Sequence, residues 1–386
     1  MKTKATLHSL KTIPVITIDL DLPPDERWQE VPKSVRAAAL RLAKKQAAMV
    51  SAMVSAMVSP MVSAIAPTDG LLSFALSAIT KLRNPYRDDI DAWAELLEAD
   101  VDDLLIGNFS YELSMANHIY SDLGVFGTIM KNLGFACTSG AVWIEGEGMV
   151  HLRTLDWSFP GLGKNTVVYH MINAPAGDFY NIGFPGYVGV LTAVAPGRFS
   201  ASINYATPVD FPSLDWPPSH LLRHIFENCA DYEEALETLE NTPTGSPALI
   251  TLVGTEKNQA AIIECLGGEN RSHPTSRNRP IAIANDFLSG ELRDERCGLG
   301  PKDVAPYAKA PENNIFADDR RNTMLRKLNS EEADSLSSAI KLLNSSPLRN
   351  SETKTQVAMC PRTGALAVFG MEDEQQVSEL LIPREP

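Results

Sequence analysis

The spacing of hydrophobic positions along this chain changes close to residue 137. Before that point most segments have a helical character, and helices are expected over residues 28–48, 70–82, 89–99 and 101–117. The exception is PVITIDLD, residues 14–21, which predicts a strand that the following Pro23-Pro24 pair ends.

From Cys137 onward, short apolar or alternating runs are separated by Gly, Pro and Asn, which predicts a meandering antiparallel sheet. Strands are expected over residues 137–144, 149–157, 166–172, 179–184, 187–195, 199–206, 248–254, 259–266, 281–286, 355–360 and 364–370. Helices are expected between these strands, over residues 219–229, 231–240, 318–328 and 331–343. Because strands and helices occur in blocks, we expect a layered α+β fold with a break at Cys137.

An uncharged repeat of the Met-Val-Ser-Ala type, AAMVSAMVSAMVSPMVSAIAPT, occupies residues 47–68. Its length would permit a membrane span, but four serines and Pro60 dilute its hydrophobicity. A four-residue repeat gives a helix a broad apolar stripe, so we expect a helix that lies in a membrane interface or faces the substrate. A membrane span and an ordinary packed helix remain the alternatives. A basic stretch precedes the repeat and consists of Lys33, Arg36, Arg41, Lys44 and Lys45.

Composition narrows the function classes. The formal net charge of -14 would repel a phosphate backbone, so no nucleic-acid partner is expected. The five cysteines contain no CxxC pair, which predicts neither a zinc site nor a disulfide framework. His220 and His224 have the spacing of two metal ligands, but the HExxH glutamate is absent and we expect both to face water. The first residues lack the apolar run of a secretory signal, so a cytoplasmic location is expected.

One candidate nucleophile stands at the start of the strand region. A hairpin that turns near residues 145–148 would bring Arg153 and Asp156 beside Cys137. A nearby positive charge favours a reactive thiolate, and suitably placed donors would hold the oxyanion formed when that thiolate attacks a carbonyl. The spacing alone leaves open a buried cysteine beside a surface ion pair.

Seven stretches, in order, carry a resemblance to a known family. They are IDLDLPPDERW (18–28), GNFSYEL (107–113), ACTS (136–139), LRTLDW (152–157), FPGYVGVLTAVAPGRFSASIN (184–204), AND (284–286) and DDRR (318–321). The chain resembles the family of acid ceramidase and N-acylethanolamine-hydrolysing acid amidase, which are N-terminal nucleophile hydrolases related to choloylglycine hydrolases. The resemblance implies a four-layer αββα sandwich with a helical N-terminal piece. It also implies a precursor cut between Ala136 and Cys137 into an alpha-subunit, residues 1–136 with an edge strand, and a catalytic beta-subunit, residues 137–386.

The resemblance also implies a role for each site residue. Cys137 would be the nucleophile and, once it is a chain terminus, its α-amine would be the base. Asp156 would orient that amine, and Arg153 would favour the thiolate and hold Asp156. Asn285 would donate to the oxyanion, and a second donor is expected just after Asn204. There the family pattern has Asn-Glu-Arg and this chain has Tyr205, so a backbone N–H donor survives while a glutamate side chain does not.

Arg320 matches the remaining site arginine and would steady the oxyanion site and the carbonyl of the nucleophile; a surface charge at a helix start is the alternative. The function implied is hydrolysis of fatty-acyl amides of the ceramide or N-acylethanolamine kind, without metal or organic cofactor. The protein would contact a membrane surface peripherally. Three alternatives stay open: a related thiol acyltransferase, a bile-salt or penicillin amidase on the same scaffold, and an inactive lipid-binding homologue.

Overall fold

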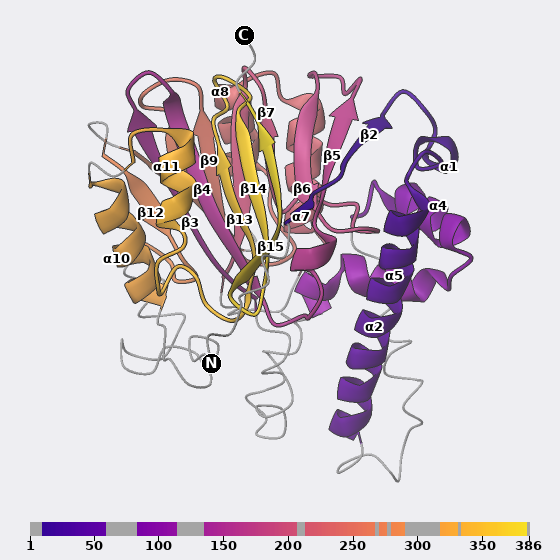
Figure 1. Cartoon of the computed structure of the whole chain (residues 1–386). Helices are drawn as coiled ribbons and strands as arrows, with labels where there is room; N and C mark the ends of the chain where they lie inside the picture. Colours follow the sequence, from indigo (N-terminus) through magenta and orange to yellow (C-terminus); the bar gives the residue numbers. More distant parts are fainter. Residues whose placement is uncertain are drawn as a thin grey trace, which may run out of the picture.

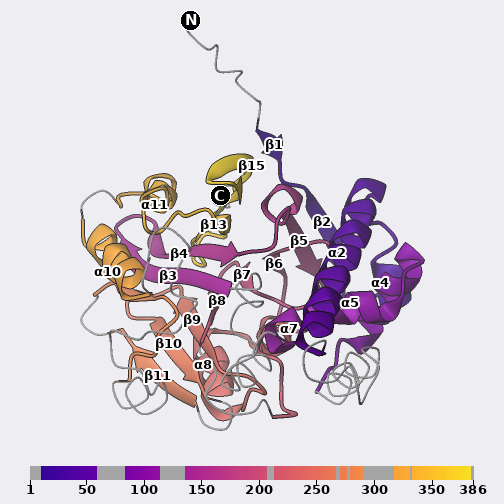
Figure 2. The ribbon, with the colours of Figure 1, turned by 90° about the horizontal axis from the view of Figure 1, so that it is seen from below.

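A computed structural model describes residues 10–58, 83–113, 135–206, 213–266, 270–275, 279–289, 317–330 and 333–383. Two sheets stack face to face, and helices cover the outer face of each (Figures 1 and 2). The expected helix over residues 70–82 and the later part of the Met-Val-Ser-Ala repeat lie outside the described residues.

The first sheet has seven strands. In spatial order they are β1 (Lys11–Thr12), β15 (Gln375–Ile382), β14 (Leu366–Glu372), β13 (Thr353–Met359), β4 (Gly148–Trp157), β3 (Phe135–Ile144) and β12 (Ile281–Ile283). Neighbouring strands are antiparallel except for β1 and β15, which are parallel. The hairpin β3–β4 lies inside this sheet, and its turn falls at residues 145–147, where it was expected.

The second sheet has eight strands. In spatial order they are β11 (Asn270–Pro274), β10 (Ala260–Cys265), β9 (Ala248–Gly254), β8 (Phe199–Tyr205), β7 (Thr192–Ala195), β6 (Phe179–Gly183), β5 (Val167–Ile172) and β2 (Val15–Asp19). From β5 to β11 the chain meanders antiparallel, as the sequence predicts, and β2 adds a parallel edge strand beside β5.

Helices form the two outer layers. On the seven-stranded sheet lie α10 (Ala317–Leu328) and α11 (Leu336–Leu342). The core of the eight-stranded sheet includes α2 (Lys33–Val58), α4 (Arg87–Leu97), α5 (Val101–Asn108), α7 (Pro218–Asn228) and α8 (Tyr232–Asn241). Two short elements, α1 (Pro24–Arg27) and the 3-10 helix η2 (Gly163–Asn165), also lie in the described part of the chain. The four-layer αββα arrangement is therefore confirmed.

Strand β9 is largely apolar on both faces because both faces are covered. In β9, Ala248, Ile250 and Leu252 pack toward the helices, whereas Leu249 and Val253 belong to other buried clusters. All seven residues of β9 are buried. A strand with one wet face would alternate apolar and polar residues, so this continuous apolar run reflects its place between two layers.

The front piece supplies an edge strand to each sheet. Lys11 and Thr12 pair with Ser378 and Glu379 at the edge of the first sheet. Only two residues separate β1 from β2, which pairs with β5 at the edge of the second sheet. The break that the sequence predicts at residues 136 and 137 falls inside β3, which begins at Phe135. The front piece is therefore part of both sheets and not a separate layer.

A buried charged cluster joins the front piece to the back piece. Arg223 of α7 lies 2.9 Å from Asp89 of α4, and the Arg223 Nε donates to Glu227 at 2.7 Å. Trp28 donates its indole N–H to Asp89 at 2.7 Å, and the Tyr86 hydroxyl donates to Glu227 at 2.8 Å. Because a buried charge is costly without partners, removal of any member would leave another uncompensated. This cluster fixes how the front helices sit against the back piece.

Several expectations need correction. The helix expected from residue 28 begins at Lys33, because Pro32 favours a helix start and residues 29–31 form a turn after α1. The strand expected over residues 187–195 is only β7, since residues 184–191 form a loop before it. Three strands were missed, namely β1, β11 and β15. Their sequences are short or polar, and they lie at or near sheet edges.

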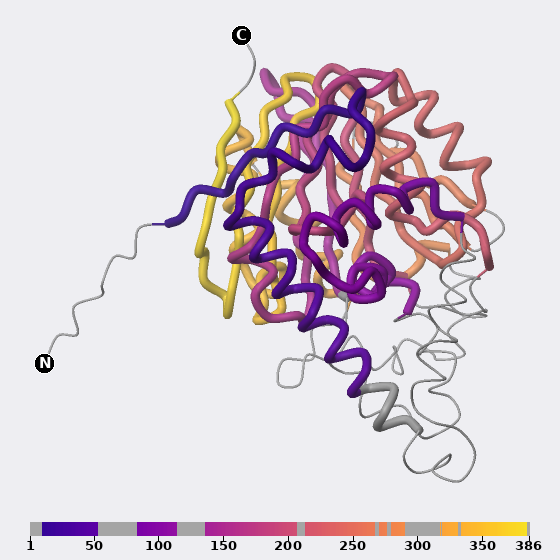
Figure 3. Tube along the Cα trace, turned by 90° about the vertical axis from the view of Figure 1, so that its right-hand side faces the viewer, coloured from indigo at the N-terminus to yellow at the C-terminus, as the bar shows by residue number. Residues whose placement is uncertain are grey.

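Both α2 and α7 bury faces that their sequences leave ambiguous. On α2, the buried positions include Leu42, Ala43, Ala47 and Val50, so the first part of the repeat is a packed helix. Figures 1 and 3 show the coloured part of α2 reaching beyond the lower ends of the strands. Within the described ranges, no helix is both long and apolar enough to cross a membrane.

On α7, the expectation of a water-facing His220 is wrong, because this side chain is buried against the rings of Tyr86 and Phe109.

Candidate active site

Cys137 lies on β3, at the interface between the two sheets. It pairs with Leu155 of β4 and is 2% exposed. Its apolar neighbours include Leu42, Trp157 and Tyr187, which belong to the same buried cluster. The other three described cysteines are buried as well, and none is in a disulfide. Cys137 differs from them because polar groups converge on it.

The guanidinium of Arg153 holds the sulfur. Arg153 lies on β4, two residues before Leu155, which is the residue that pairs with Cys137. Its Nη2 donates to the Cys137 Sγ at 3.2 Å and to the Ile203 carbonyl at 2.9 Å. Its Nη1 donates to the Leu191 carbonyl and the Thr192 hydroxyl. This fully buried cation is therefore anchored to the second sheet and aimed at the thiol.

Asn285 and Tyr205 lie on the other side of Cys137. The backbone N–H of Cys137 donates to the Asn285 Oδ1 at 3.1 Å, and the Asn285 Nδ2 donates to the Tyr205 carbonyl at 2.8 Å. The backbone N–H of Tyr205 hydrogen-bonds the Cys137 sulfur. An amide nitrogen carries two hydrogens, so Asn285 keeps a second N–H beyond the one given to Tyr205. These two N–H groups are suitably placed to stabilise negative charge formed beside the sulfur.

Arg320 connects Cys137 with Asn285 and is buried, at 3% exposure. Its Nη1 donates to the Cys137 carbonyl at 2.6 Å, and its Nη2 donates to the Asn285 Oδ1 at 2.6 Å. Both the Cys137 N–H and the Arg320 Nη2 are donors, so they fix the orientation of the Asn285 amide. The alternative that Arg320 is a surface charge at a helix start is wrong.

Asp156 is fully buried opposite Ala136, the residue before Cys137. Thr353 donates its hydroxyl to the Asp156 Oδ1 at 2.7 Å, and Asn350 donates to the Oδ2 at 3.0 Å. Arg320 lies 3.8 Å from the same Oδ2. The hydrogen bonds that hold Asp156 therefore come from Thr353 and Asn350, not from Arg153 as expected. Asn350 comes from the segment just before β13 and Thr353 is the first residue of that strand, and the sequence offered no signal for either.

Burial and charge act against each other in this site. Burial raises the pKa of the Cys137 thiol, and the Arg153 guanidinium opposes that rise. Burial also raises the pKa of Asp156, and Arg320 together with the hydrogen bonds from Thr353 and Asn350 opposes it. Two buried guanidiniums face one carboxylate here, so a thiolate at Cys137 would balance the charge.

A second group of polar side chains joins the two sheets behind the site. Ser139, two residues after Cys137, donates to the Asn204 Oδ1 at 2.7 Å. The Asn204 Nδ2 donates to the carbonyl of Ala284, the residue before Asn285, at 2.8 Å. His151 bonds Ser202 through its Nε2 at 3.0 Å, and burial lowers the pKa of this imidazole to about 3, so it is neutral. Asn204 therefore ties the strand of the nucleophile to the segment that presents Asn285.

All six residues singled out from the sequence thus meet in one place: Cys137, Arg153, Asp156, Tyr205, Asn285 and Arg320. Tyr205 contributes through its backbone, and its side chain packs against the Tyr111 ring. Among the described residues, no group of three or more His, Cys, Asp or Glu side chains could hold a metal ion. The arrangement suits attack on a carbonyl by the thiol, with the negative charge received by N–H groups.

Comparison with known proteins found relatives of two named kinds. A family model described as the beta subunit of N-acylethanolamine-hydrolyzing acid amidase matches residues 11–68. The N-acylethanolamine-hydrolyzing acid amidase of Caenorhabditis elegans is 26% identical over 252 residues, which cover 59% of this chain and 62% of that protein. The acid ceramidase of Mus musculus is 25% identical over 368 residues, which cover 88% of this chain and 82% of that protein.

The chain is therefore similar to acid ceramidases and to N-acylethanolamine-hydrolyzing acid amidases, in agreement with the resemblance seen in its sequence. The alignment spans less than two thirds of the nematode relative and most of the mouse one. A solved structure of the nematode amidase has 21% sequence identity and a TM-score of 0.47, and covers 64% of this chain and 100% of that chain. The family model matches the front piece under the label of a beta subunit, whereas the resemblance labels that piece alpha.

We expect Arg153→Met to raise the pH at which Cys137 reacts with iodoacetamide. The variant removes the positive charge 3.2 Å from the sulfur, so the thiolate loses its main electrostatic support and its pKa rises further. An opposite charge at this range shifts a pKa by about 1–3 units. The midpoint of the alkylation rate against pH, followed for the Cys137 peptide by mass spectrometry, should move upward by that amount.

The matched control is Arg198→Met, since Arg198 also donates to buried backbone carbonyls, those of Phe226 and Cys229, but does not contact Cys137 in the described structure. An identical midpoint in wild type and Arg153→Met would show that Arg153 does not support the thiolate.

Proposed function

We propose that this protein is an amidohydrolase that cleaves fatty-acyl amides of the ceramide or N-acylethanolamine kind, with Cys137 as an N-terminal nucleophile. One observation carries the proposal: the Cys137 sulfur lies within hydrogen-bonding reach of both Arg153 and the Tyr205 N–H, while its own backbone N–H bonds Asn285. A structural cysteine needs none of these contacts. The names of the relatives support the same class of reaction.

Maturation begins with the intact chain. The Cys137 thiol attacks the carbonyl carbon of Ala136, the C–N bond between the two residues breaks, and the acyl group of Ala136 passes to sulfur as a thioester. Water then hydrolyses the thioester and leaves a carboxylate on Ala136. The products are two chains from one precursor, and Cys137 gains a free α-amine. Until then its nitrogen is an amide, which cannot act as a base near neutral pH.

Turnover uses the new amine. An α-amine titrates near 7.7–8.0 in model compounds, so it can accept the thiol proton. The thiolate attacks the amide carbonyl, and the Tyr205 N–H and the second Asn285 N–H bind the oxyanion. The leaving nitrogen takes the proton as its bond to carbon breaks, and water hydrolyses the acyl thioester. Asp156, held by Thr353 and Asn350, orients the amine.

The replacement of the family glutamate by Tyr205 leaves this route intact. The contribution of residue 205 comes from its backbone N–H, which any residue other than proline supplies. The side chain packs against the Tyr111 ring, in the apolar cluster that also contains Cys137. Tyr205 therefore gives no reason to regard the protein as an inactive homologue.

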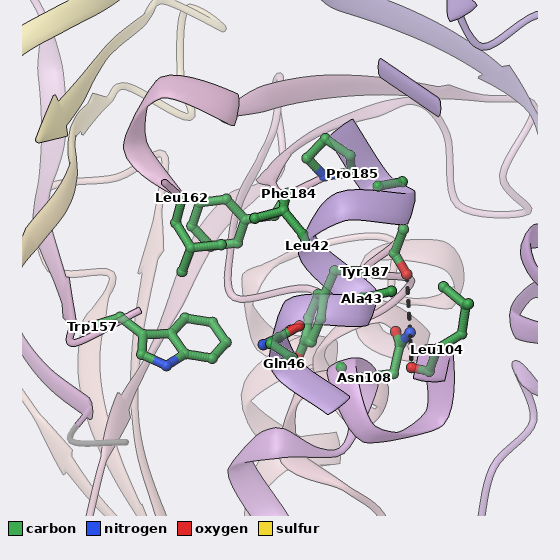
Figure 4. Close-up of a pocket in the computed structure, with 13 residues that line it drawn as sticks. Leu42, Ala43, Gln46, Leu104, Asn108, Trp157, Leu162, Phe184, Pro185 and Tyr187 are labelled. Atoms are coloured by element: carbon green, nitrogen blue, oxygen red, sulfur yellow. Dashed lines mark hydrogen bonds between the residues drawn. The ribbon is translucent and has the colours of Figure 1, made fainter. Parts of the chain in front are cut away.

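The surroundings of Cys137 suit an acyl chain. A narrow cavity of about 20 Å³ lies beside the cluster that contains Cys137, and apolar side chains provide most of its wall (Figure 4). The wall consists of Ala39, Leu42, Ala43 and Gln46 of α2, Leu104, Gly107 and Asn108 of α5, Trp157, Leu162 and the loop residues 184–187. Each methylene buried there would contribute about 0.8 kcal/mol to the free energy of binding. A long acyl chain would therefore gain the most binding energy, provided that the side chains of the wall move apart to admit it.

The repeat and the basic stretch on α2 support contact with a membrane surface. Lys33, Arg36, Arg41 and Lys44 lie on the same helix as the repeat, and cationic and apolar residues together favour an interface between lipid and water. The same helix lines the cavity, so a lipid could pass from the bilayer along α2. The cytoplasmic location expected from the sequence stays a prediction.

Cys137→Ala tests maturation. The wild type should separate into two chains on a denaturing gel, the larger beginning Cys-Thr-Ser-Gly, whereas the variant should remain one chain and be inactive because it has no nucleophile. Intact mass and N-terminal sequencing give the readout. Cys265→Ala, which changes a buried thiol elsewhere in the core, should mature as the wild type does. A wild type that hydrolyses lipid amides at full rate with Cys137 still internal would refute the mechanism.

Asn285→Ala tests the oxyanion site. Loss of one preorganised donor should lower turnover of an acyl amide by about 100- to 1000-fold while Cys137 stays open to alkylation. Because Asn285 also receives the Cys137 N–H, maturation is checked first by intact mass, and turnover is measured on the mature fraction. Asn228→Ala, at a more exposed asparagine of α7, serves as control. Unchanged turnover would exclude Asn285 from the site.

Deletion of residues 49–64 tests the membrane contact. Loss of the repeat should lower activity on amides presented in lipid vesicles at least about tenfold more than activity on a soluble short-chain amide, because only the former must be drawn from a bilayer. Rates on both substrates are measured with the same preparation. Equal loss on both would mean that the repeat serves only as a packed helix.

A further inference from the structure

Asn108 is a buried amide at the end of α5 that none of the reaction steps uses. It is 2% exposed and comes from the front piece, in the stretch GNFSYEL. Its Nδ2 donates to the carbonyls of Leu104 and Gly186, both at 2.9 Å, and its Oδ1 accepts from the Val188 N–H at 2.8 Å. Figure 4 shows the two donated bonds, one to its own helix and one across to the loop.

The loop that Asn108 holds is one wall of the cavity. Phe184, Pro185, Gly186 and Tyr187 all line it. The loop turns tightly, since the Tyr187 N–H donates to the Phe184 carbonyl at 3.1 Å and Gly186 has a φ of +82°, which favours glycine. Such a loop has few bonds of its own to fix its position.

Two side chains hold this loop from opposite sides. Asn108 bonds the backbone at Gly186 and Val188, and Arg223 donates to the Val188 carbonyl at 3.0 Å. Arg223 itself is held by Asp89 of the front piece. The contacts made by Asn108 and Arg223 therefore depend on the front piece, although the loop belongs to the back piece, where Tyr169 also bonds the Gly186 backbone. Phe184 and Tyr187 share the apolar cluster of Cys137, so the position of the loop decides the space beside the nucleophile.

We infer that Asn108 is a positioning residue that sets the acyl-chain preference of the site by fixing the 184–188 loop, so that the front piece selects the substrate although the back piece carries the chemistry. The inference rests on the proposed function for its substrate class. Asn108 touches neither the sulfur nor the oxyanion donors in the described structure, so its loss should change recognition of the chain and not the chemical step.

Asn108→Asp is the first test. The carboxylate keeps the shape of the side chain and its acceptor for Val188 but loses both donated bonds, and it faces two carbonyl oxygens. A loop shift that exposes two methylenes of a bound chain would cost about 1.6 kcal/mol, which is about 15-fold. We expect kcat/KM for a 16-carbon acyl amide to fall about 15-fold relative to that for a 4-carbon acyl amide of the same amine, with the change in KM and little change in kcat.

A second variant reaches the loop without touching Asn108. Gly186→Ala places a methyl group at a φ that disfavours it, 3.4 Å from the Ala39 Cβ and 3.5 Å from the Leu104 Cδ1. Gly186→Ala should shift the chain-length preference in the same direction as Asn108→Asp. If circular dichroism shows that Asn108→Asp is unfolded, the result for Gly186→Ala alone tests the role of the loop. The matched control is Asn270→Asp, because Asn270 also donates two bonds to carbonyls, those of Leu239 and Thr242, at the far sheet edge.

Binding of free fatty acids gives a readout that does not need turnover. Calorimetry with 4-carbon and 16-carbon acids should show about 15-fold weaker binding of the long acid to Asn108→Asp and Gly186→Ala, and unchanged binding to Asn270→Asp. A wild type that binds the long acid but hydrolyses no amide would refute the proposed function and leave the inference standing. Equal loss at both chain lengths, or no loss in either loop variant, would refute the role of Asn108.

Discussion

The charge of Arg153, buried between two sheets, is the constraint on which the site depends. Removing a guanidinium from water is costly unless oxygen or sulfur acceptors surround it, and here they come from two elements of the second sheet and from Cys137. The same contacts that satisfy the cation set the distance between the sheets at this point. The contacts of this one side chain therefore hold the two sheets together and also hold the Cys137 sulfur in place.

Around this cation the site is held by backbone as much as by side chains. Arg320 binds the Cys137 carbonyl, Asn204 binds the carbonyl before Asn285, and Tyr205 acts through its N–H. Strands supply such groups at fixed spacing, so a site built at a sheet interface needs few special side chains. This explains how the chain can carry Tyr205 where the family has an acidic residue.

The sequence predicted the local parts of this site better than the distant ones. A hairpin with a turn after Ile144 has only one register that matches its length, so Arg153 and Asp156 could be placed beside Cys137 from spacing. Asn285 and Arg320 lie more than a hundred residues away, and only the resemblance to a family brought them in. Thr353 and Asn350 were missed, because hydroxyl and amide residues in a turn carry no pattern that points to a partner. The edge strands β1 and β11 were missed for a related reason, since edge positions do not require apolar residues.

The placement of β1 and β2 limits what a cut before Cys137 could accomplish. Each strand closes one edge of a sheet through main-chain hydrogen bonds, and β15 and β5 would otherwise present open N–H and C=O groups to other chains. Loss of the front piece would thus leave two sheet edges unpaired, and both could pair with strands of other chains. A cut before Cys137 would consequently change covalent connectivity without changing the assembly, and the front piece would remain as a subunit instead of being shed as a propeptide.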